Sequence, residues 1–433
     1  MSLMTIALLG IIIMLCCVLL GVNIGLSMAV VGFFGYSAVR NFPAAIAILG
    51  QYSVSSSMTY TMTVIPLFVL MGNFAFHSGI SDDLFLSSRI WFGRIKGSIA
   101  YAAIMACALF GAICGSLAAT TATMSKVAKP IMSEHKYKDE VIGGTLACGG
   151  TLGVLIPPST IFIIYGVMTE VSIGKLFAAG VMPGIVMAIC FCGVIVLWTK
   201  KDKDACPAGR SYSMKEKAIS LKGFVGMFIV FFIVLGGMFS GTVSVTEAAA
   251  LGALVTFVIM FIRRRITGFT LKESFLETIV TTGMVMLNIV GANIFGNFMS
   301  VTNLPINLAN GIMAMNMSPI MVIVIIIVIY GVLGCIMDIL ALVILSLPIF
   351  MPIIDILGFD KVWFGVLIVM ITNLGSITPP VGLSCYVASG VMEMPLGKVF
   401  RGAVPFLMAF AVSFALICAF PGISLWLPGL VVG

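Results

Sequence analysis

Residues 149–177 read GGTLGVLIPPSTIFIIYGVMTEVSIGKLF, and residues 373–400 read NLGSITPPVGLSCYVASGVMEMPLGKVF. Each stretch has a Pro-Pro pair in its middle and ends in Gly-Lys-Leu-Phe or Gly-Lys-Val-Phe. The copies keep a nearly constant spacing, because 222 positions separate Pro157 from Pro379 and 223 separate Gly174 from Gly397. This self-similarity predicts two structural repeats, each about half of the 433-residue chain. At about the same offset, Gly115 falls near Gly334.

The composition excludes a soluble protein. Hydrophobic residues make up 61% of the chain and charged residues 9%, against about 45–50% and roughly 25% in soluble domains. Apolar runs such as residues 227–239 and 320–329 do not alternate with a period of two, as strands of a membrane barrel would. Because lipid cannot hydrogen-bond to a bare backbone, these runs must be helices. We therefore predict an all-α polytopic membrane protein with the lipid bilayer around it.

The net charge of +7 indicates membrane topology rather than nucleic-acid binding, because the basic residues cluster in short loops. One cluster lies in residues 200–222 and another in residues 263–265, and both are expected in the cytoplasm. The basic residues of the first cluster are Lys200, Lys201, Lys203, Arg210, Lys215, Lys217 and Lys222. The two spans predicted between the clusters, residues 223–240 and 245–262, return the chain to the same side. The two assignments therefore agree.

The loop charges predict a re-entrant hairpin in the first half. Residues 174–199 run inward and residues 139–169 run outward, so the lysine-containing loop before residue 139 is cytoplasmic. Residues 101–132 begin and end on that side, and must turn back near Gly115 and Ser116. The two spans before residue 61 place the N-terminus in the periplasm, which leaves Arg40 on the unexpected side.

The second half repeats this series in the opposite orientation. Residues 274–300 run outward, and residues 321–353 enter and leave from the outside with a turn near residues 334–338. Residues 362–391 run inward in two pieces, and residues 399–420 run outward, which places the C-terminus in the periplasm. An inverted-topology repeat with two re-entrant hairpins and two broken helices is a recurrent design of secondary transporters.

The predicted repeat boundaries follow from this topology. The first repeat, residues 1–215, comprises scaffold spans at 1–98, a hairpin and broken helix at 99–173, a span at 174–199 and a cytoplasmic linker at 200–215. The second repeat, residues 216–433, comprises scaffold spans at 216–317, a hairpin and broken helix at 318–393 and a span at 394–420.

The Pro-Pro pairs predict that each repeat contains two half-helices joined by unwound backbone. Proline lacks an N–H and clashes with the preceding helical turn, and the residue before it is pushed toward extended geometry. Unwound carbonyls at membrane depth are unfavourable unless they line a cavity or bind a ligand. Such carbonyls suit Na⁺, whereas half-helix N-termini suit an anion. A simple proline kink without a binding site is the alternative reading.

Asp338 is the strongest single candidate for a functional side chain. An acid within a membrane segment costs about 2.5–3.5 kcal/mol on insertion scales and is functional by default. The alternative is a structural acid that caps a helix. Asn373, Ser376 and Thr378 lie on the matching broken helix and could complete an oxygen-lined site.

We predict two Na⁺ sites, each between a hairpin turn and a broken helix. The candidate ligands are Ser116, Gly149, Thr151, Gly153 and Pro158 for the first site, and Gly334, Asp338, Asn373, Gly375 and Thr378 for the second. The adjacent substrate pocket is expected to include Ser116, Thr120, Pro157, Asp338 and Pro379. Na⁺ would draw the two hairpin tips together, so cation binding is expected to precede binding of the acid.

Residues 111–131, 149–184 and 334–352 resemble the large membrane subunit of tripartite ATP-independent periplasmic (TRAP) transporters, with overall similarity to the sialic-acid type. The resemblance implies a Na⁺-driven elevator importer in the bacterial inner membrane. It also implies a small membrane subunit and a periplasmic binding protein that delivers a sialic acid or a C4-dicarboxylate. Ala118 and Ala119 depart from more polar relatives and can offer only backbone ligands. Residues 81–97 suit an amphipathic helix that braces the scaffold.

Three other functions compete with this reading. A passive organic-anion channel or facilitator would share the helices but need no cation site and no partner. An ATP-driven permease would need a separate ATPase, because the chain has no P-loop. An intramembrane enzyme is disfavoured, because the only histidines are His77 at the end of a span and His135 in a lysine-rich loop, so no His–Ser or His–metal constellation is evident. The cysteines show no metal-ligand spacing and are interpreted as small hydrophobic residues.

Overall fold

The computed structural model describes residues 2–202, 205–314 and 317–430, and for residues 57, 309 and 312–314 the backbone alone. Within these ranges the chain is helical, and its only extended pairing is an isolated bridge between Lys96 and Ala208. Eight of the described helical segments are long and apolar enough to cross a membrane. The prediction of an all-α polytopic membrane protein is therefore confirmed.

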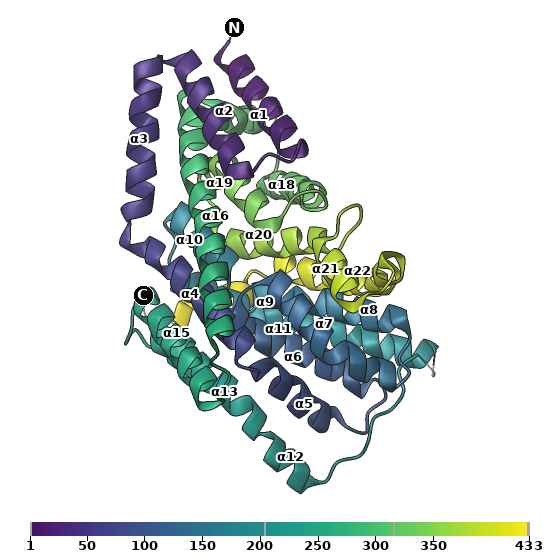
Figure 1. The fold of residues 1–433 in the computed structure, drawn as a ribbon. Helices are drawn as coiled ribbons and strands as arrows, with labels where there is room; N and C mark the ends of the chain where they lie inside the picture. Colours follow the sequence, from purple (N-terminus) through teal and green to yellow (C-terminus); the bar gives the residue numbers. More distant parts are fainter. Residues whose placement is uncertain (1, 203–204, 315–316, 431–433) are drawn as a thin grey trace.

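The N-terminal helices are α1 (Leu3–Leu19), α2 (Ile24–Val39), α3 (Phe42–Met58), the 3-10 turn η1 (Tyr60–Thr63) and α4 (Val64–His77). The sequence predicted two spans before residue 61, whereas the structure has three helices there. Asn41 separates α2 from α3, because its side chain accepts a hydrogen bond from the Ala44 N–H and so caps a new helix. α3 lies alongside α16 (Gly268–Val301) and is not among the helices apolar enough to cross (Figure 1).

Residues 81–97 were expected to form an amphipathic helix, and α5 (Ile80–Phe92) occupies most of that range. Leu84 and Phe85 are buried on one face, whereas Asp82 and Trp91 are exposed. The second half has α17 (Leu304–Ala314) at the equivalent place, directly before its hairpin.

The two predicted hairpins are present. The first consists of α6 (Ser98–Cys114) and α7 (Leu117–Glu134), and the second of α18 (Pro319–Gly334) and α19 (Ile339–Leu357). The two helices of each pair contact one another. Gly115 makes the first turn possible, because its φ of +63° lies in the left-handed region that side chains disfavour.

The two broken helices interrupt at the Pro-Pro pairs, as predicted. The first is α8 (Asp139–Gly150), the single turn α9 (Leu152–Leu155) and α10 (Thr160–Thr169). The second is α20 (Lys361–Ser376) and α21 (Leu383–Met392). Both Pro-Pro peptide bonds are cis. Each broken helix is followed by a long helix, α11 (Ile173–Lys201) or α22 (Leu396–Ala419).

The predicted linker between the repeats is helical at both ends, because α11 continues to Lys201 and α12 (Met214–Ser220) precedes α13 (Lys222–Phe231). Its middle packs on the base of the first hairpin. The Tyr137 hydroxyl accepts a hydrogen bond from the Ile99 N–H at 3.2 Å and donates one to the Pro207 carbonyl at 3.0 Å. After α13 come the π-turn η2 (Phe232–Gly236), α14 (Gly237–Phe239) and α15 (Val245–Ile262).

The hairpins and broken helices form one central block, and the first broken helix is largely buried in it. In the most apolar window of residues 139–169, 78% of positions are buried, against 28% in residues 214–239 and 33% in α15. α8 packs on α22, α6, α7 and α21, so it is enclosed by helices of both repeats. The outer helices α4, α5, α13, α15 and α16 pack on one another and lie on one side of this block (Figure 1). The short elements α23 (Gly422–Leu425) and η3 (Pro428–Leu430) close the described chain.

Candidate functional site

The tip of the first hairpin is bonded to the first break. Ser116 is the N-cap of α7, and its Oγ accepts a hydrogen bond from the Ala119 N–H at 3.4 Å. The carbonyl of Gly115 accepts hydrogen bonds from the Thr160 N–H at 3.3 Å and from the Thr160 hydroxyl at 3.2 Å. A Cβ atom at Gly115 would lie 2.6 Å from the Pro158 oxygen, so only glycine permits this approach.

The tip of the second hairpin repeats this arrangement. Asp338 is the N-cap of α19, and its Oδ2 accepts a hydrogen bond from the Leu340 N–H at 3.1 Å. The carbonyl of Cys335 accepts a hydrogen bond from the Val381 N–H at 3.2 Å, so this tip is also bonded to the break beside it. Asp338 therefore caps helix α19 in the structure, as the alternative interpretation of this residue expected.

The structure refines the alignment of the two turns. The N-caps Ser116 and Asp338 are 222 positions apart and hold equivalent places. Gly334 ends α18 near its turn, as expected, and contacts Gly375 in the way that Gly111 contacts Gly153. In these contacts Gly334 is the counterpart of Gly111, whereas Gly115 lies directly before its N-cap.

One glycine–glycine contact joins each hairpin to its broken helix. A Cβ at Gly111 would lie 2.3 Å from the Gly153 Cα, and a Cβ at Gly375 would lie 2.3 Å from the Gly334 carbonyl carbon. These distances are possible only between backbones without side chains. Gly153 and Gly375 are 222 positions apart, so the same crossing occurs once in each repeat.

Buried polar side chains lie next to both crossings. Asn373 on α20 is fully buried, and neither its Nδ2 nor its Oδ1 has a hydrogen-bond partner among the described residues. Thr120 on α7 is fully buried as well, and its hydroxyl lacks a partner in the same part of the chain. A Cβ at Gly153 would lie 2.5 Å from that hydroxyl oxygen, which places it against the broken helix. Each such group costs about 1–3 kcal/mol if nothing satisfies it.

A neighbouring hydroxyl pair links the two repeats. The Ser384 hydroxyl on α21 donates to the Ala147 carbonyl on α8 at 2.6 Å. The Thr121 hydroxyl lies 3.1 Å from Ser384 Oγ. Because Ser384 gives its only hydroxyl hydrogen to Ala147, Thr121 donates the hydrogen bond between the two hydroxyls. The first hairpin, the first broken helix and the second broken helix therefore share one hydrogen-bond network.

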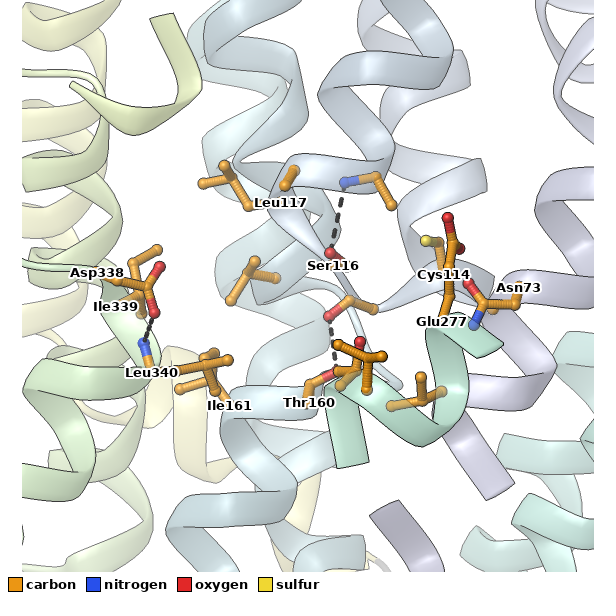
Figure 2. A pocket seen from close by; sticks show the side chains of 18 of the residues that line it. Asn73, Cys114, Ser116, Leu117, Thr160, Ile161, Glu277, Asp338, Ile339 and Leu340 are labelled. Carbon is orange, nitrogen blue, oxygen red and sulfur yellow. Dashed lines mark hydrogen bonds between the residues drawn. The ribbon is translucent and has the colours of Figure 1, made fainter. Parts of the chain in front are cut away.

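A cavity of about 560 Å³ opens between the two hairpin tips. Ser116, Thr160 and Asp338 line it from the buried block, and Asn73 on α4 and Glu277 on α16 line it from the outer helices (Figure 2). In this view Asp338 lies on one side of the Ser116 tip, and Asn73 and Glu277 lie on the other. None of the lining residues that the structure describes is a lysine, an arginine or a histidine.

Four helix N-termini converge on this cavity. The first residues of α7, α10, α19 and α21 all line it: Leu117, Thr160, Ile339 and Leu383. Each of these helices has at least ten residues, so each N-terminus carries a positive partial charge of about half a unit. Side chains cap part of the N–H groups of α7, α10 and α19, whereas α21 has no side-chain cap. The positive partial charge at the cavity comes from backbone dipoles. The negative charge comes from the side chains of Asp338 and Glu277.

The predicted ligands of the first cation site lie together along the break. Thr151 ends α8, and its hydroxyl donates to the Cys148 carbonyl at 2.6 Å. A Cβ at Gly149 would lie 2.9 Å from the Cys107 sulfur of α6, so Gly149, like Gly153 and Pro158, faces the first hairpin. At the second site, the Thr378 hydroxyl donates to the Leu374 carbonyl at 2.7 Å, and the Ser376 hydroxyl to the Asn373 carbonyl at 2.7 Å.

The structure brings together two of the five predicted substrate residues at the cavity, namely Ser116 and Asp338. Thr120 and Pro157 are buried behind the lining, and Pro379 is exposed. The five assignments remain predictions about binding.

Sequence reasoning missed Asn73 and Glu277. Asn73 donates hydrogen bonds to the Thr278 hydroxyl at 2.9 Å and to the Ser274 carbonyl at 3.3 Å, and so fastens α4 to α16. Glu277 lies inside the segment that was predicted to span the membrane at residues 274–300. The criterion that singled out Asp338, an acid within a membrane segment, therefore applied to Glu277 as well.

Comparison with known proteins places the chain in a family. The family model described as the DctM component of the tripartite ATP-independent periplasmic transporter matches residues 11–423. A C4-dicarboxylate TRAP transporter large permease protein of Pseudomonas aeruginosa is 34% identical over 387 residues, which cover 89% of this chain and 90% of the relative. A sialic acid TRAP transporter large permease protein of Vibrio cholerae is 32% identical over 383 residues, covering 86% and 87%.

The fold has a solved counterpart. The YdaH transporter of Alcanivorax borkumensis, whose crystal structure was described as having an unusual topology, superposes with a TM-score of 0.67 at 12% identity, covering 88% of this chain and 89% of that one. That identity shows the fold alone. The relatives that share sequence are named as permeases, so this multi-pass protein serves transport and is not an enzyme. The chain belongs to the large permease, or DctM, component of the TRAP transporters.

Proposed function

We propose that this subunit imports a small organic acid across the bacterial inner membrane by Na⁺ symport. A periplasmic binding protein delivers the acid, and a small membrane subunit completes the transporter. The family membership supports this proposal, as do relatives named for C4-dicarboxylate and sialic acid transport. Both cargo classes are represented at similar identity, so the proposal is for an organic acid of either class.

The observation that carries the proposal is the convergence of four helix N-termini on one cavity. Backbone N–H groups at a helix N-terminus bind carboxylates, and partly buried geometries contribute up to about 2 kcal/mol each. The cavity offers no basic side chain among its described lining, so these N-termini are its means of holding an anion. Its volume of about 560 Å³ suits a small solute.

The two carboxylates in the cavity explain why transport requires a cation. Asp338 and Glu277 would repel an entering acid, because like charges at short range in a low-dielectric site interact strongly. A cation bound near Asp338 removes part of this repulsion and leaves the helix N-termini free to hold the acid. Na⁺ binding therefore comes first and substrate binding second.

The buried block supplies groups that fit Na⁺. In transporters of this design, oxygens of unwound carbonyls, amides and hydroxyls bind Na⁺. Asn373 offers a buried amide oxygen without a hydrogen-bond partner among the described residues, and Thr120 offers a hydroxyl in the same condition. Asn373 and Asp338 would serve the second site, and Thr120 and Ser116 the first, each with carbonyls of the adjacent break.

An elevator movement is consistent with the position of the cavity. Ser116, Thr160 and Asp338 belong to the buried block of hairpins and broken helices, whereas Asn73 and Glu277 belong to the outer helices. A substrate between them would travel with the block and leave the outer helices behind.

Reconstitution tests the proposal. The large and small subunits are placed in vesicles with an imposed Na⁺ gradient, and uptake of a C4-dicarboxylate and of a sialic acid is measured with and without the binding protein. Uptake of one of the acids should require both the gradient and the binding protein. Equal uptake without the gradient would indicate a passive facilitator and reject the symport mechanism.

A further inference from the structure

A second cavity, distinct from the candidate site, lies between the first hairpin and the outer helices. It is a groove of about 420 Å³ bounded by α6, α11, α13 and the end of α5. Side chains that line it include Tyr101, Met105, Ile156, Ile189, Phe228 and Phe231. Apart from the Tyr101 hydroxyl and the Cys192 thiol, every described lining side chain is apolar.

The chemistry of the groove fits a hydrocarbon. Ile189 is 64% exposed, and Phe228 and Met105 are more than two-fifths exposed, so the groove opens on the outer surface of the helices. In a membrane protein that surface faces acyl chains. A polar solute would lose its hydrogen bonds there without finding replacements, whereas an acyl chain gains dispersion contacts with the walls.

Three basic residues lie close in the chain to residues that line one end of the groove. Phe92 lines that end, and Arg94 and Lys96 follow it by two and four residues. Lys222 begins α13, five residues before the lining residue Met227, which is about 7.5 Å along the helix axis. All three basic side chains are in exposed positions, and none has an ion pair among the residues that the structure describes.

The surrounding groups do not neutralise these cations. Asp83 lies beside the start of α13 but pairs with Arg263 at 2.6 Å. Glu216 on α12 caps its own helix through the Ser213 N–H at 2.6 Å. Trp91, next to Phe92, is 45% exposed, and tryptophan marks the level of the lipid headgroups.

We propose that the groove binds one anionic phospholipid, with an acyl chain along α6, α11 and α13 and its phosphate held by Arg94, Lys96 and Lys222. The apolar walls select a lipid chain, and the three cations select its charge. α6 belongs to the central block and α11 packs against it, whereas α13 packs against α5 and α15 of the outer helices. The lipid therefore bridges two parts of the molecule. If the block slides as proposed for transport, the lipid must shift or leave, so its binding favours one position of the block.

Lipid retention tests the site without any transport measurement. The protein is purified from nanodiscs of phosphatidylethanolamine with added phosphatidylglycerol, and bound lipids are counted by native mass spectrometry. The wild type should retain one phosphatidylglycerol in preference to phosphatidylethanolamine. The double variant Arg94→Gln/Lys222→Gln should lower this preference about 25-fold, since each cation near an anionic headgroup contributes about fivefold. The control Arg264→Gln/Lys272→Gln, at exposed positions that do not line the groove, should leave this preference unchanged.

A second pair of variants tests the groove itself. Ala188→Phe fills the groove from α11, and Ala250→Phe places the same ring on the exposed face of α15. Ala188→Phe should lose the retained lipid, while Ala250→Phe keeps it. The proposal is overturned if the wild type retains both lipids equally, or if each test variant behaves like its control. Because retention needs neither Na⁺ nor substrate, failure of symport would leave these results unaffected.

Discussion

A single methyl group at Gly375 should separate the second hairpin from its broken helix. The Cβ of an alanine there would lie 2.3 Å from the carbonyl carbon of Gly334, 2.6 Å from its oxygen and 2.7 Å from its Cα. All three atoms are backbone, so no side chain can rotate away. The reverse substitution on the same contact, Gly334→Ala, is far milder, because its Cβ would lie 3.5 Å from the nearest atom, the Thr372 Cα.

The expected cost of Gly375→Ala is about 1–3 kcal/mol, the usual range for overpacking a well-packed interior. If the second cation site forms only when the hairpin tip packs on α20, this cost appears as a 5- to 160-fold weaker apparent Na⁺ affinity. Gly334→Ala places its Cβ at ordinary van der Waals distance and adds a better helix former, so its effect should stay within about twofold. A matched position elsewhere on α18, Gly331→Ala, has its nearest neighbours at 3.6 Å and should also be neutral.

Two measurements separate the effects. The half-saturating Na⁺ concentration for uptake is measured in vesicles, and the Na⁺-induced rise in melting temperature is measured on purified protein. Gly375→Ala should weaken both, while Gly334→Ala and Gly331→Ala follow the wild type. The reasoning is refuted if Gly375→Ala has wild-type Na⁺ dependence and stability, or if Gly334→Ala is as damaging as Gly375→Ala.

Three further predictions follow from contacts in other parts of the chain. Asp338→Asn keeps a cap for the Leu340 N–H, so melting should be unchanged while Na⁺-driven uptake weakens; wild-type uptake and Na⁺ dependence would make Asp338 purely structural. Tyr137→Phe removes the acceptor of the buried Ile99 N–H and should cost about 1–3 kcal/mol in unfolding free energy. Burial raises the pKa of the Tyr137 phenol from 10.0 to about 12. The destabilisation by Tyr137→Phe should therefore be constant below pH 10 and shrink between pH 10 and 12, because the phenol loses its proton first in the unfolded chain. A destabilisation that changes near neutral pH would contradict this prediction. Lys215→Cys should react with an impermeant thiol reagent only from the cytoplasmic side, and labelling only from the periplasm would invert the topology.

The breaks and the hairpins could be predicted because their causes are local. Pro157 and Pro158 remove two backbone donors wherever they occur, so the helix has to end before them. Gly115 and Ser116 supply a left-handed residue and an N-cap in succession, which is the chemistry of a helix–turn–helix reversal. The repeat spacing then transferred the same elements to the second half.

The cavity could be predicted only in part, because its walls come from distant segments. Ser116 and Asp338 were identified from their places in the turns, but Asn73 and Glu277 reach the site through the packing of α4 on α16. The separation of α3 from α2 was missed for a different reason. Only Arg40 and Asn41 lie between the two helices, and hydropathy averaged over a span does not resolve so short a break.

The cap and the cation-site readings of Asp338 are compatible. An N-cap position favours serine and aspartate alike, and the two repeats use one of each, Ser116 and Asp338. A carboxylate has two oxygens and about four acceptor sites, so the bond to Leu340 at 3.1 Å leaves capacity for a cation. Serine at the equivalent position caps its helix but adds no charge. The two proposed cation sites would therefore be related by symmetry in their backbone and unequal in their charge. The second site has a carboxylate at the cap and the buried amide of Asn373, two residues before the Gly375 crossing. It should hold Na⁺ more tightly than the first site, which should depend more on carbonyls of the break.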